Sequence, residues 1–340
     1  MSKTYDAILF MSFGGPEGPD EVLPFLRNVV KGRNIPDERL VRVASHYNHF
    51  GGISPINGCN RDIIKRLREN LHKSGVNLPI YWGNRNWHPL IADTVENMKN
   101  DGIENAVVLL TSAYSSYSSC RQYKENIEEA IAIHKSNLKI TKIRPYFNHP
   151  KFIDANVEMI SQALLQFGNK AKSVKLIFTA HSVPLTMAEG CLYQTQLEWA
   201  AKTIAKRLNV ENFTMAYQSR SGSPRDPWLE PDILDVLVSD CKTSENVLIS
   251  PIGFISDHME VVYDLDLEAK NKARELGLNF VRAKTASNSE IFIEMLVDLV
   301  LEIMENKIPS IHPDFDLVKP SCDVECCPKM ALDSLAKVLN

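Results

Sequence analysis

His181 is the side chain best placed to do chemistry, because it directly follows a β-rich apolar run at 176–180. Ligands of open α/β folds bind at the carboxyl ends of the strands. An imidazole there can accept protons near neutral pH or bind a borderline metal such as Fe(II). A buried, hydrogen-bonded core histidine is an equally good interpretation of a lone His at a strand end, so a second feature has to decide.

A row of carboxylates supplies that feature. Its three carboxylates are spaced four residues apart: Glu260, Asp264 and Glu268. Ser256 or Asp257 can cap a helix that carries the row on one face. Like charges at this spacing weaken a helix by roughly a few tenths of a kcal/mol per pair, and a divalent cation would offset that repulsion. A solvated acidic face is the commoner alternative, but the apolar segment at 251–255 indicates that the row begins buried.

Cysteines form another candidate metal set. Three crowd into the last twenty residues with the spacing Cys322-x-x-x-Cys326-Cys327, and Cys120 is the expected fourth. An odd total of seven argues against a disulfide framework. Four thiolates accommodate a structural zinc or a [2Fe-2S] cluster equally well. The other three lie in unrelated segments and are interpreted as ordinary thiols: Cys59, Cys191 and Cys241.

Two loops have the residues to hold an organic ligand. Gly51-Gly-Ile-Ser-Pro is rich in turn formers, and the run at 112–123 offers hydroxyls, aromatic rings and Arg121. The second loop suits a flat ligand that bears carboxylates, although helix-capping serines are the alternative. Phe13-Gly-Gly-Pro lacks the G-x-G-x-x-G spacing, so no dinucleotide is expected.

The elements that must position these residues alternate along the chain. Short apolar runs predict strands at 7–10, 80–82, 106–110, 138–143, 174–178, 213–217 and 247–249. Longer periodic segments predict helices at 21–30, 61–72, 92–99, 123–134, 152–166, 197–207 and 264–276. This alternation is typical of parallel sheets with helices on both faces.

The pattern also restarts near residue 150, where a second buried strand again runs into a polar loop that contains a proline. We therefore expect an α/β protein with two similar Rossmann-like domains, each a parallel sheet flanked by helices. The expected parts are 1–149, 150–308 and a Cys-rich tail at 309–340.

Composition narrows the class of protein. The 340 residues carry a net charge of −4 without a basic block, so nucleic acid is not an expected partner. The apolar stretch at 291–304 is interrupted by Glu294, Asp298 and Glu302, which predicts an amphipathic helix rather than a membrane segment. The N-terminus lacks the pattern of a secretory signal, which favours a cytoplasmic protein.

Together these motifs resemble the ferrochelatase family, whose members insert Fe(II) into a porphyrin. The resemblance spans about 5–308 and rests on four motifs: Gly51-Gly-Ile-Ser-Pro, Ala180-His-Ser-Val-Pro, Asp226-Pro-Trp-Leu-x-Pro-Asp and Ser256-Asp-His-Met-Glu-Val-Val-Tyr-Asp-Leu-Asp-Leu-Glu. The run at 115–123 and the Cys-rich tail resemble the actinobacterial branch. The resemblance implies a chelatase-like fold, coproporphyrin III as substrate and coproheme as product in haem biosynthesis.

The resemblance also implies roles for individual residues. His181 and Glu260 match the metal-inserting pair, which faces the porphyrin from opposite sides and handles Fe(II) as a substrate. Asp264 and Glu268 match an acidic row that serves as a path for metal or protons. Positions that touch the porphyrin or lie beside it are Tyr47, Ser54 and Tyr123.

Two positions depart from Gram-positive relatives, since Phe13 replaces an iron-coordinating tyrosine and Val30 replaces a propionate-binding arginine. The family's iron-sulfur enzymes imply a [2Fe-2S] cluster held by four thiolates: Cys120, Cys322, Cys326 and Cys327. The C-x3-C-C spacing of the tail differs from the C-x2-C-x4-C of animal enzymes.

Other interpretations remain open at this point. A chelatase for cobalt or nickel is one, although such relatives carry further histidines in the metal site. Protoporphyrin IX is an alternative substrate, and a non-catalytic haem or metal carrier is a further alternative. The expected partners are a porphyrin and ferrous iron, with transient contacts to an iron donor and a coproheme acceptor.

Overall fold

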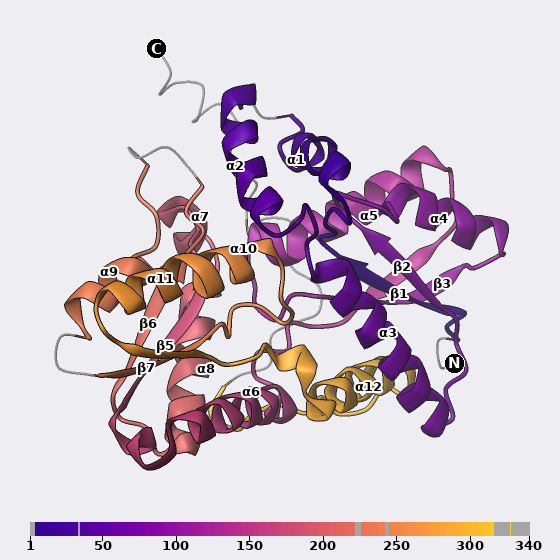
Figure 1. The fold of residues 1–340 in the computed structure, drawn as a ribbon. Coiled ribbons are helices and arrows are strands. Elements are labelled where there is room, and N and C mark those ends of the chain that lie inside the picture. Colours follow the sequence, from indigo (N-terminus) through magenta and orange to yellow (C-terminus); the bar gives the residue numbers. More distant parts are fainter. Residues whose placement is uncertain (1–3, 33–34, 222–225, 242–244, 316–326, 328–340) are drawn as a thin grey trace.

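The computed structural model describes residues 4–32, 35–221, 226–241, 245–315 and 327. Two four-stranded parallel sheets lie side by side (Figure 1). The first, in the order β2-β1-β3-β4, contains β1 (Ala7–Ser12), β2 (Ile80–Asn84), β3 (Asn105–Leu110) and β4 (Lys139–Lys142). The second, in the order β6-β5-β7-β8, contains β5 (Val174–His181), β6 (Phe213–Gln218), β7 (Asn246–Ser250) and β8 (Asn279–Arg282). The equivalent strand orders confirm the predicted repeat of two similar α/β halves.

Helices surround both sheets. Those of the first half are α1 (Val22–Val29), α2 (Asp37–His49), α3 (Ile56–Lys73), α4 (Ile91–Asn100) and α5 (Gln122–Ile133). Those of the second half are α6 (Pro150–Leu164), α7 (Leu185–Glu189), α8 (Tyr193–Leu208), α9 (Ile233–Ser239), α10 (Met259–Val261), α11 (Lys270–Glu275) and α12 (Glu290–Met304). Short 3₁₀ segments are η1 (Pro19–Glu21), η3 (Leu165–Ser173) and η5 (Ala286–Asn288), and π-helical segments are η2 (Tyr117–Arg121) and η4 (Val262–Ala269).

The central strands explain why the sheets form. Every residue of β1 is buried, and so is every residue of β5 before His181, because helices cover both faces of a parallel sheet. β5 therefore reads as a nearly continuous apolar run that ends in a polar side chain. The fold places His181 at the carboxyl end of its sheet, as the sequence predicts.

The helix predicted at 264–276 differs in detail. It begins earlier, at Met259, and passes through the π-helical η4 before α11. Its capping residue is His258, whose Nδ1 accepts the N–H of Glu260 at 3.1 Å, and neither Ser256 nor Asp257 takes this role. Asp257 is engaged elsewhere, in an ion pair with Arg282 at 3.1 Å.

The two halves share one hydrophobic core. Its largest cluster takes Phe10 and Leu109 from the first sheet, Phe178 and Leu248 from the second, and Phe292 from α12. Although α12 comes late in the chain, it packs against α3 of the first half as well as α6 (Figure 1). The domain limits expected at 149/150 and 308 stay a prediction.

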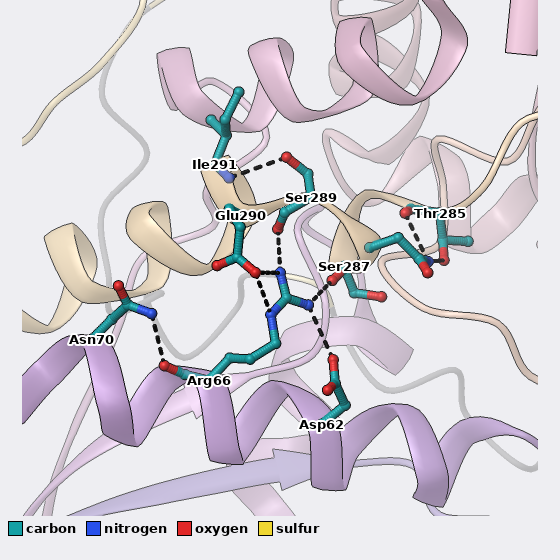
Figure 2. Close-up of polar contacts among 9 residues, drawn as sticks. Asp62, Arg66, Asn70, Thr285, Ser287, Ser289, Glu290 and Ile291 are labelled. Atoms are coloured by element: carbon teal, nitrogen blue, oxygen red, sulfur yellow. Dashed lines mark hydrogen bonds and ion pairs between the residues drawn. The ribbon is translucent and has the colours of Figure 1, made fainter. Parts of the chain in front are cut away.

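A polar junction fixes α3 to the start of α12 (Figure 2). The guanidinium of Arg66 donates to the carbonyls of Ser287 at 2.8 Å and Ser289 at 2.9 Å, and pairs with Glu290 and Asp62. The Arg66 side chain is only 16% exposed and its bonds to the two carbonyls are part-buried, whereas the Asp62 and Glu290 side chains are largely exposed. Arg66 thus satisfies backbone acceptors that would otherwise lack a donor.

Arg66→Ala is expected to lower the free energy of unfolding by about 2 kcal/mol, because it leaves two part-buried carbonyls without a partner. Arg68→Ala, at an exposed position of the same helix, should change it by less than about 0.5 kcal/mol. Urea unfolding of both variants measures this difference. Equal unfolding midpoints for the two variants would show that the contacts of Arg66 do not stabilise the protein.

The first residues of the predicted tail pack against residues of both halves. Arg144 donates to the carbonyl of Ser310 at 2.7 Å, and the ring of Phe315 contacts those of Phe147 and Trp199 at centroid distances of 4.9 and 5.2 Å. Cys322 and Cys326 lie outside the described residues. Within those residues, none of the helices has both the length and the apolar character needed to cross a bilayer.

Candidate functional site

A cavity of about 450 Å³ lies between the two halves. One wall is largely apolar and takes side chains from α1 and α2 together with Phe13 and Val30, two positions where a departure from Gram-positive relatives is expected. The facing wall belongs to the second half and contains the carboxylates of Glu260, Asp264 and Glu268, here called the acidic row. A flat apolar ligand can therefore lie against one wall while charged groups face it from the other.

His181 stands beside the first carboxylate of the row. Its Nε2 lies 3.5 Å from Oε1 of Glu260, and the side chains are 30% and 46% exposed. Its Nδ1 contacts the carbonyl of Ser182. Because a carbonyl only accepts hydrogen bonds, Nδ1 carries the proton, and the lone pair of a neutral ring lies on Nε2, toward Glu260. His181 and Glu260 are thus in direct contact, which leaves no room for a porphyrin between them in this structure, and their expected roles on opposite sides of the ring stay a prediction.

The two groups shift each other's pKa in opposite directions. Burial lowers the pKa of His181, but the charge and hydrogen bond of Glu260 together with the Ser182 carbonyl outweigh it and raise the pKa to about 9. Burial raises the pKa of Glu260, but the nearby imidazolium outweighs it and holds that pKa well below its usual value. At neutral pH the pair is an imidazolium beside a carboxylate.

The other two carboxylates of the acidic row hold protons more tightly than Glu260 does. Burial and the charges of Glu260 and Glu268 raise the pKa of Asp264 to about 7, although a hydrogen bond from the Ser219 hydroxyl lowers it. Burial, followed by the charge of Asp232, raises the pKa of Glu268. Partial protonation therefore relieves the repulsion that the sequence pattern leaves uncompensated. The row begins in α10 and continues into the π-helical η4, and all three carboxylates line the cavity.

Several residues around this pair were not predicted to have a role. The Nδ1 of His258 lies 3.9 Å from Oε2 of Glu260, and burial lowers the pKa of His258, so this ring stays neutral. Gln218 donates to the carbonyl of Glu260 at 2.6 Å. The ring of His46 on α2 stacks on that of Tyr263 with centroids 3.8 Å apart. His258 was visible in the sequence motif, whereas the other contacts join segments that are distant in the chain.

The predicted porphyrin-contacting residues divide into two groups. Tyr47 lines the cavity and packs against the ring of Phe25 at a centroid distance of 5.8 Å. Among the described residues, those lining the cavity do not include Ser54 or Tyr123. Ser54 is buried and donates its N–H to the carbonyl of Pro16, and the ring of Tyr123 lies under the guanidinium of Arg85. Contact of these two with a porphyrin stays a prediction.

The cysteines show one unexpected neighbour. Cys120 in η2 and Cys327 are buried, and the thiol of Cys191 hydrogen-bonds with that of Cys327 and interacts with that of Cys120. The hydrogen bond with Cys327 lowers the pKa of Cys191 to about 7. Cys191 is therefore not the isolated thiol that the sequence suggests. Within the described residues no three His, Cys, Asp or Glu side chains form a metal site, so a cluster would need Cys322 and Cys326.

The fold is that of the chelatases. A solved structure of the sirohydrochlorin chelatase SirB from Bacillus subtilis subspecies spizizenii, in complex with cobalt, aligns with a TM-score of 0.54 over 89% of this chain and 97% of its own. The two sequences are 11% identical, so this likeness concerns the fold alone.

The chain belongs to the ferrochelatase family, whose sequence model matches residues 5–304. A ferrochelatase of Rhodopirellula baltica is 45% identical over 95% of this chain and 93% of its own. A coproporphyrin III ferrochelatase of Mycobacteroides abscessus is 45% identical over 89% and 90%, and one of Streptomyces coelicolor is 43% identical over 97% and 95%. The protein is thus an enzyme, a metal chelatase that acts on a porphyrin.

Proposed function

We propose that this enzyme inserts Fe(II) into coproporphyrin III to give coproheme. The observation that carries the reaction is the contact of His181 with Glu260, since Glu260 lines a cavity whose other wall is largely apolar, although His181 itself is not among the described residues that line it. The choice of substrate is supported by relatives named coproporphyrin III ferrochelatase, which are 43–45% identical over most of this chain. The alternative of a cobalt or nickel chelatase has only a fold-level likeness in its favour.

The reaction must remove two pyrrole protons and deliver a desolvated Fe(II) to the four nitrogens. His181 binds Fe(II) or accepts a proton only when its Nε2 lone pair is available. Since the pKa of His181 is about 9, a proton occupies this nitrogen at neutral pH and competes with the metal. Arrival of Fe(II) beside Glu260 favours loss of that proton, because two positive charges then face each other.

The acidic row provides a route for the displaced proton. Asp264, with a pKa of about 7, can take up and release protons at neutral pH, unlike the strongly acidic Glu260. The Ser219 hydroxyl donates a hydrogen bond to the Asp264 carboxyl group. This bond holds the carboxyl group in place and still allows it to carry a proton. We infer that protons leave from the pair along Asp264 to Glu268, which borders the same cavity.

The test is anaerobic insertion of Fe(II) into coproporphyrin III and protoporphyrin IX, followed side by side by absorbance. Faster turnover of coproporphyrin III is expected. A preference for protoporphyrin IX would keep the mechanism and replace the substrate. Stoichiometric retention of metal and porphyrin without turnover would instead identify a carrier protein.

We also propose that the tail binds a [2Fe-2S] cluster through Cys120, Cys322, Cys326 and Cys327. The structure supports the donor chemistry, since the thiols of Cys120 and Cys327 lie near a further thiol at Cys191. When bound, the cluster would link the tail to η2 by metal–thiolate bonds. Reduced thiols need a reducing compartment, which supports the cytoplasmic location and, with it, transient contacts to an iron donor and a coproheme acceptor.

Replacing any of the four proposed ligands with serine is expected to remove the cluster, because a serine hydroxyl is a poor ligand for iron in such clusters. Iron and acid-labile sulfide content of the purified variants measures this. Cys241→Ser, at a buried thiol that packs in a core cluster of the second half, is the control and should keep both. Loss of the cluster in Cys191→Ser, with retention in one of the four, would place Cys191 among the ligands.

A further inference from the structure

Arg282, the last residue of β8, binds two carboxylates that lie on either side of Glu260 in the chain. Its guanidinium donates from Nε and Nη2 to the carboxylate of Asp266 at 2.6 and 2.8 Å. It donates from Nη1 and Nη2 to the carboxylate of Asp257 at 3.1 Å each, and Nη1 also donates to the carbonyl of Ala283 at 3.3 Å. All five N–H donors of the guanidinium are therefore engaged.

The two carboxylates bracket the segment that begins the acidic row. Asp257 directly precedes His258, whose Nδ1 accepts the N–H of Glu260 and caps the helix. Asp266 lies in η4, midway between the second and third carboxylates of the row. Residues two apart on a helix do not share a face, and the described residues that line the cavity include the row but neither Asp257 nor Asp266. The helix thus turns the row toward the cavity and Asp266 toward Arg282.

These ion pairs are shielded more than ordinary surface pairs. The side chain of Arg282 is 13% exposed, and those of Asp257 and Asp266 are 23% and 34% exposed. Each carboxylate accepts two bonds from the planar fork of the guanidinium, which fixes its orientation as well as its position. The start of the helix and its π-helical turn are therefore both attached to the end of β8.

We propose that Arg282 is a positioning residue for metal insertion, which holds the segment 257–266 so that Glu260 meets Fe(II) beside His181. This inference rests on the proposed function, because it requires Glu260 to handle the metal. Without the guanidinium, Asp257 and Asp266 would repel each other and the nearby acidic row, and the segment would lose its fixed orientation. Replacing residues that orient metal-binding side chains typically costs about 10- to 100-fold in metal affinity or activity.

The experiment compares Arg282→Gln with Arg66→Gln. Arg66 is a matched control because its side chain is 16% exposed and it also pairs with two carboxylates (Figure 2). It is not among the described residues that line the cavity. Anaerobic insertion rates at varied Fe(II) give the KM for the metal, and the fluorescence of metal-free coproporphyrin III gives the porphyrin affinity. In Arg282→Gln the KM for Fe(II) should rise about tenfold while the porphyrin affinity stays unchanged, whereas Arg66→Gln should lose stability and keep the wild-type KM.

Two further variants separate orientation from folding. Arg282→Lys keeps the charge but has three donors and no planar fork, so it should recover part of the loss. Asp266→Asn keeps Arg282 with its bonds to Asp257, and its half-buried side chain makes it a milder change than Arg282→Gln. A smaller rise in the KM for Fe(II) is expected in this variant, which takes the place of Arg282→Gln if that protein does not fold.

A wild-type KM for Fe(II) in folded Arg282→Gln would overturn the inference. An equal rise in Arg66→Gln at the same melting temperature would also overturn it, because lower stability would then explain the effect. Where Arg282→Gln does not fold, a wild-type KM in Asp266→Asn has the same meaning. Glu260→Gln tests the proposed function separately: an unchanged KM for Fe(II) there would remove Glu260 from metal handling, whereas a change there without one in Arg282→Gln refutes only the positioning role.

Discussion

His181→Ala is expected to lower the rate of Fe(II) insertion by at least about 10³-fold, because it removes the imidazole whose Nε2 lies beside Glu260. The side chain is 30% exposed, and its polar contacts are Glu260 and the Ser182 carbonyl. Its loss therefore opens no large gap in the core, and the fold should survive. Insertion into coproporphyrin III, followed anaerobically by absorbance, measures the effect.

A matched control is available in the first half. His134 lies 3.9 Å from Glu96, so His134→Ala removes another histidine beside a carboxylate, away from the cavity, and should leave activity intact. Porphyrin fluorescence and circular dichroism check that His181→Ala still binds and folds. Imidazole added to this variant should restore part of the rate by occupying the vacated position. Insertion near the wild-type rate would exclude His181 from the mechanism.

Much of the fold follows from local pattern. The buried runs that became β1 and β5 are apolar over their whole length, and this signal alone predicts central strands of a parallel sheet. Helix α2 was missed although Leu40, Ala44 and Tyr47 recur on one face, because polar residues dominate its sequence. The packing of α12 on α3 depends on contacts between distant segments, which no local pattern reports.

The candidate site was predictable to a similar degree. Local sequence patterns mark both members of the pair: His181 ends an apolar strand, and Glu260 begins a row of carboxylates on a helix. The structure brings the two side chains together. The π-helical turn was not predictable, because the spacing of four residues fits an α-helix equally well. The contact of Cys191 with Cys327 and that of Arg39 with Ser221 join segments more than 100 residues apart. Only the tertiary structure places such groups side by side.

Glu260→Gln is expected to lower Fe(II) insertion about 10²-fold while leaving the affinity for metal-free coproporphyrin III nearly unchanged. The amide keeps the size of the side chain but carries no charge, so it binds Fe(II) poorly and cannot accept a proton. Steady-state rates at varied Fe(II), together with porphyrin fluorescence, separate the two effects. A defect confined to porphyrin binding would contradict a role for Glu260 in handling metal or protons.

The pH dependence of the same variant gives an independent readout. In the wild type the pKa of His181 is raised to about 9, so its proton competes with Fe(II) below that pH, and the KM for Fe(II) should fall as the pH rises toward 9. Burial lowers the pKa of His181, and loss of the Glu260 charge removes the largest influence that raises it, so the pKa of His181 should fall in the variant. The fall in KM should therefore move to lower pH in Glu260→Gln. Glu96→Gln, which alters the His134–Glu96 pair away from the cavity, should keep the wild-type profile. Identical profiles for Glu260→Gln and the wild type would mean that Glu260 does not control the protonation of His181, and the proposed competition between proton and metal would have to be abandoned.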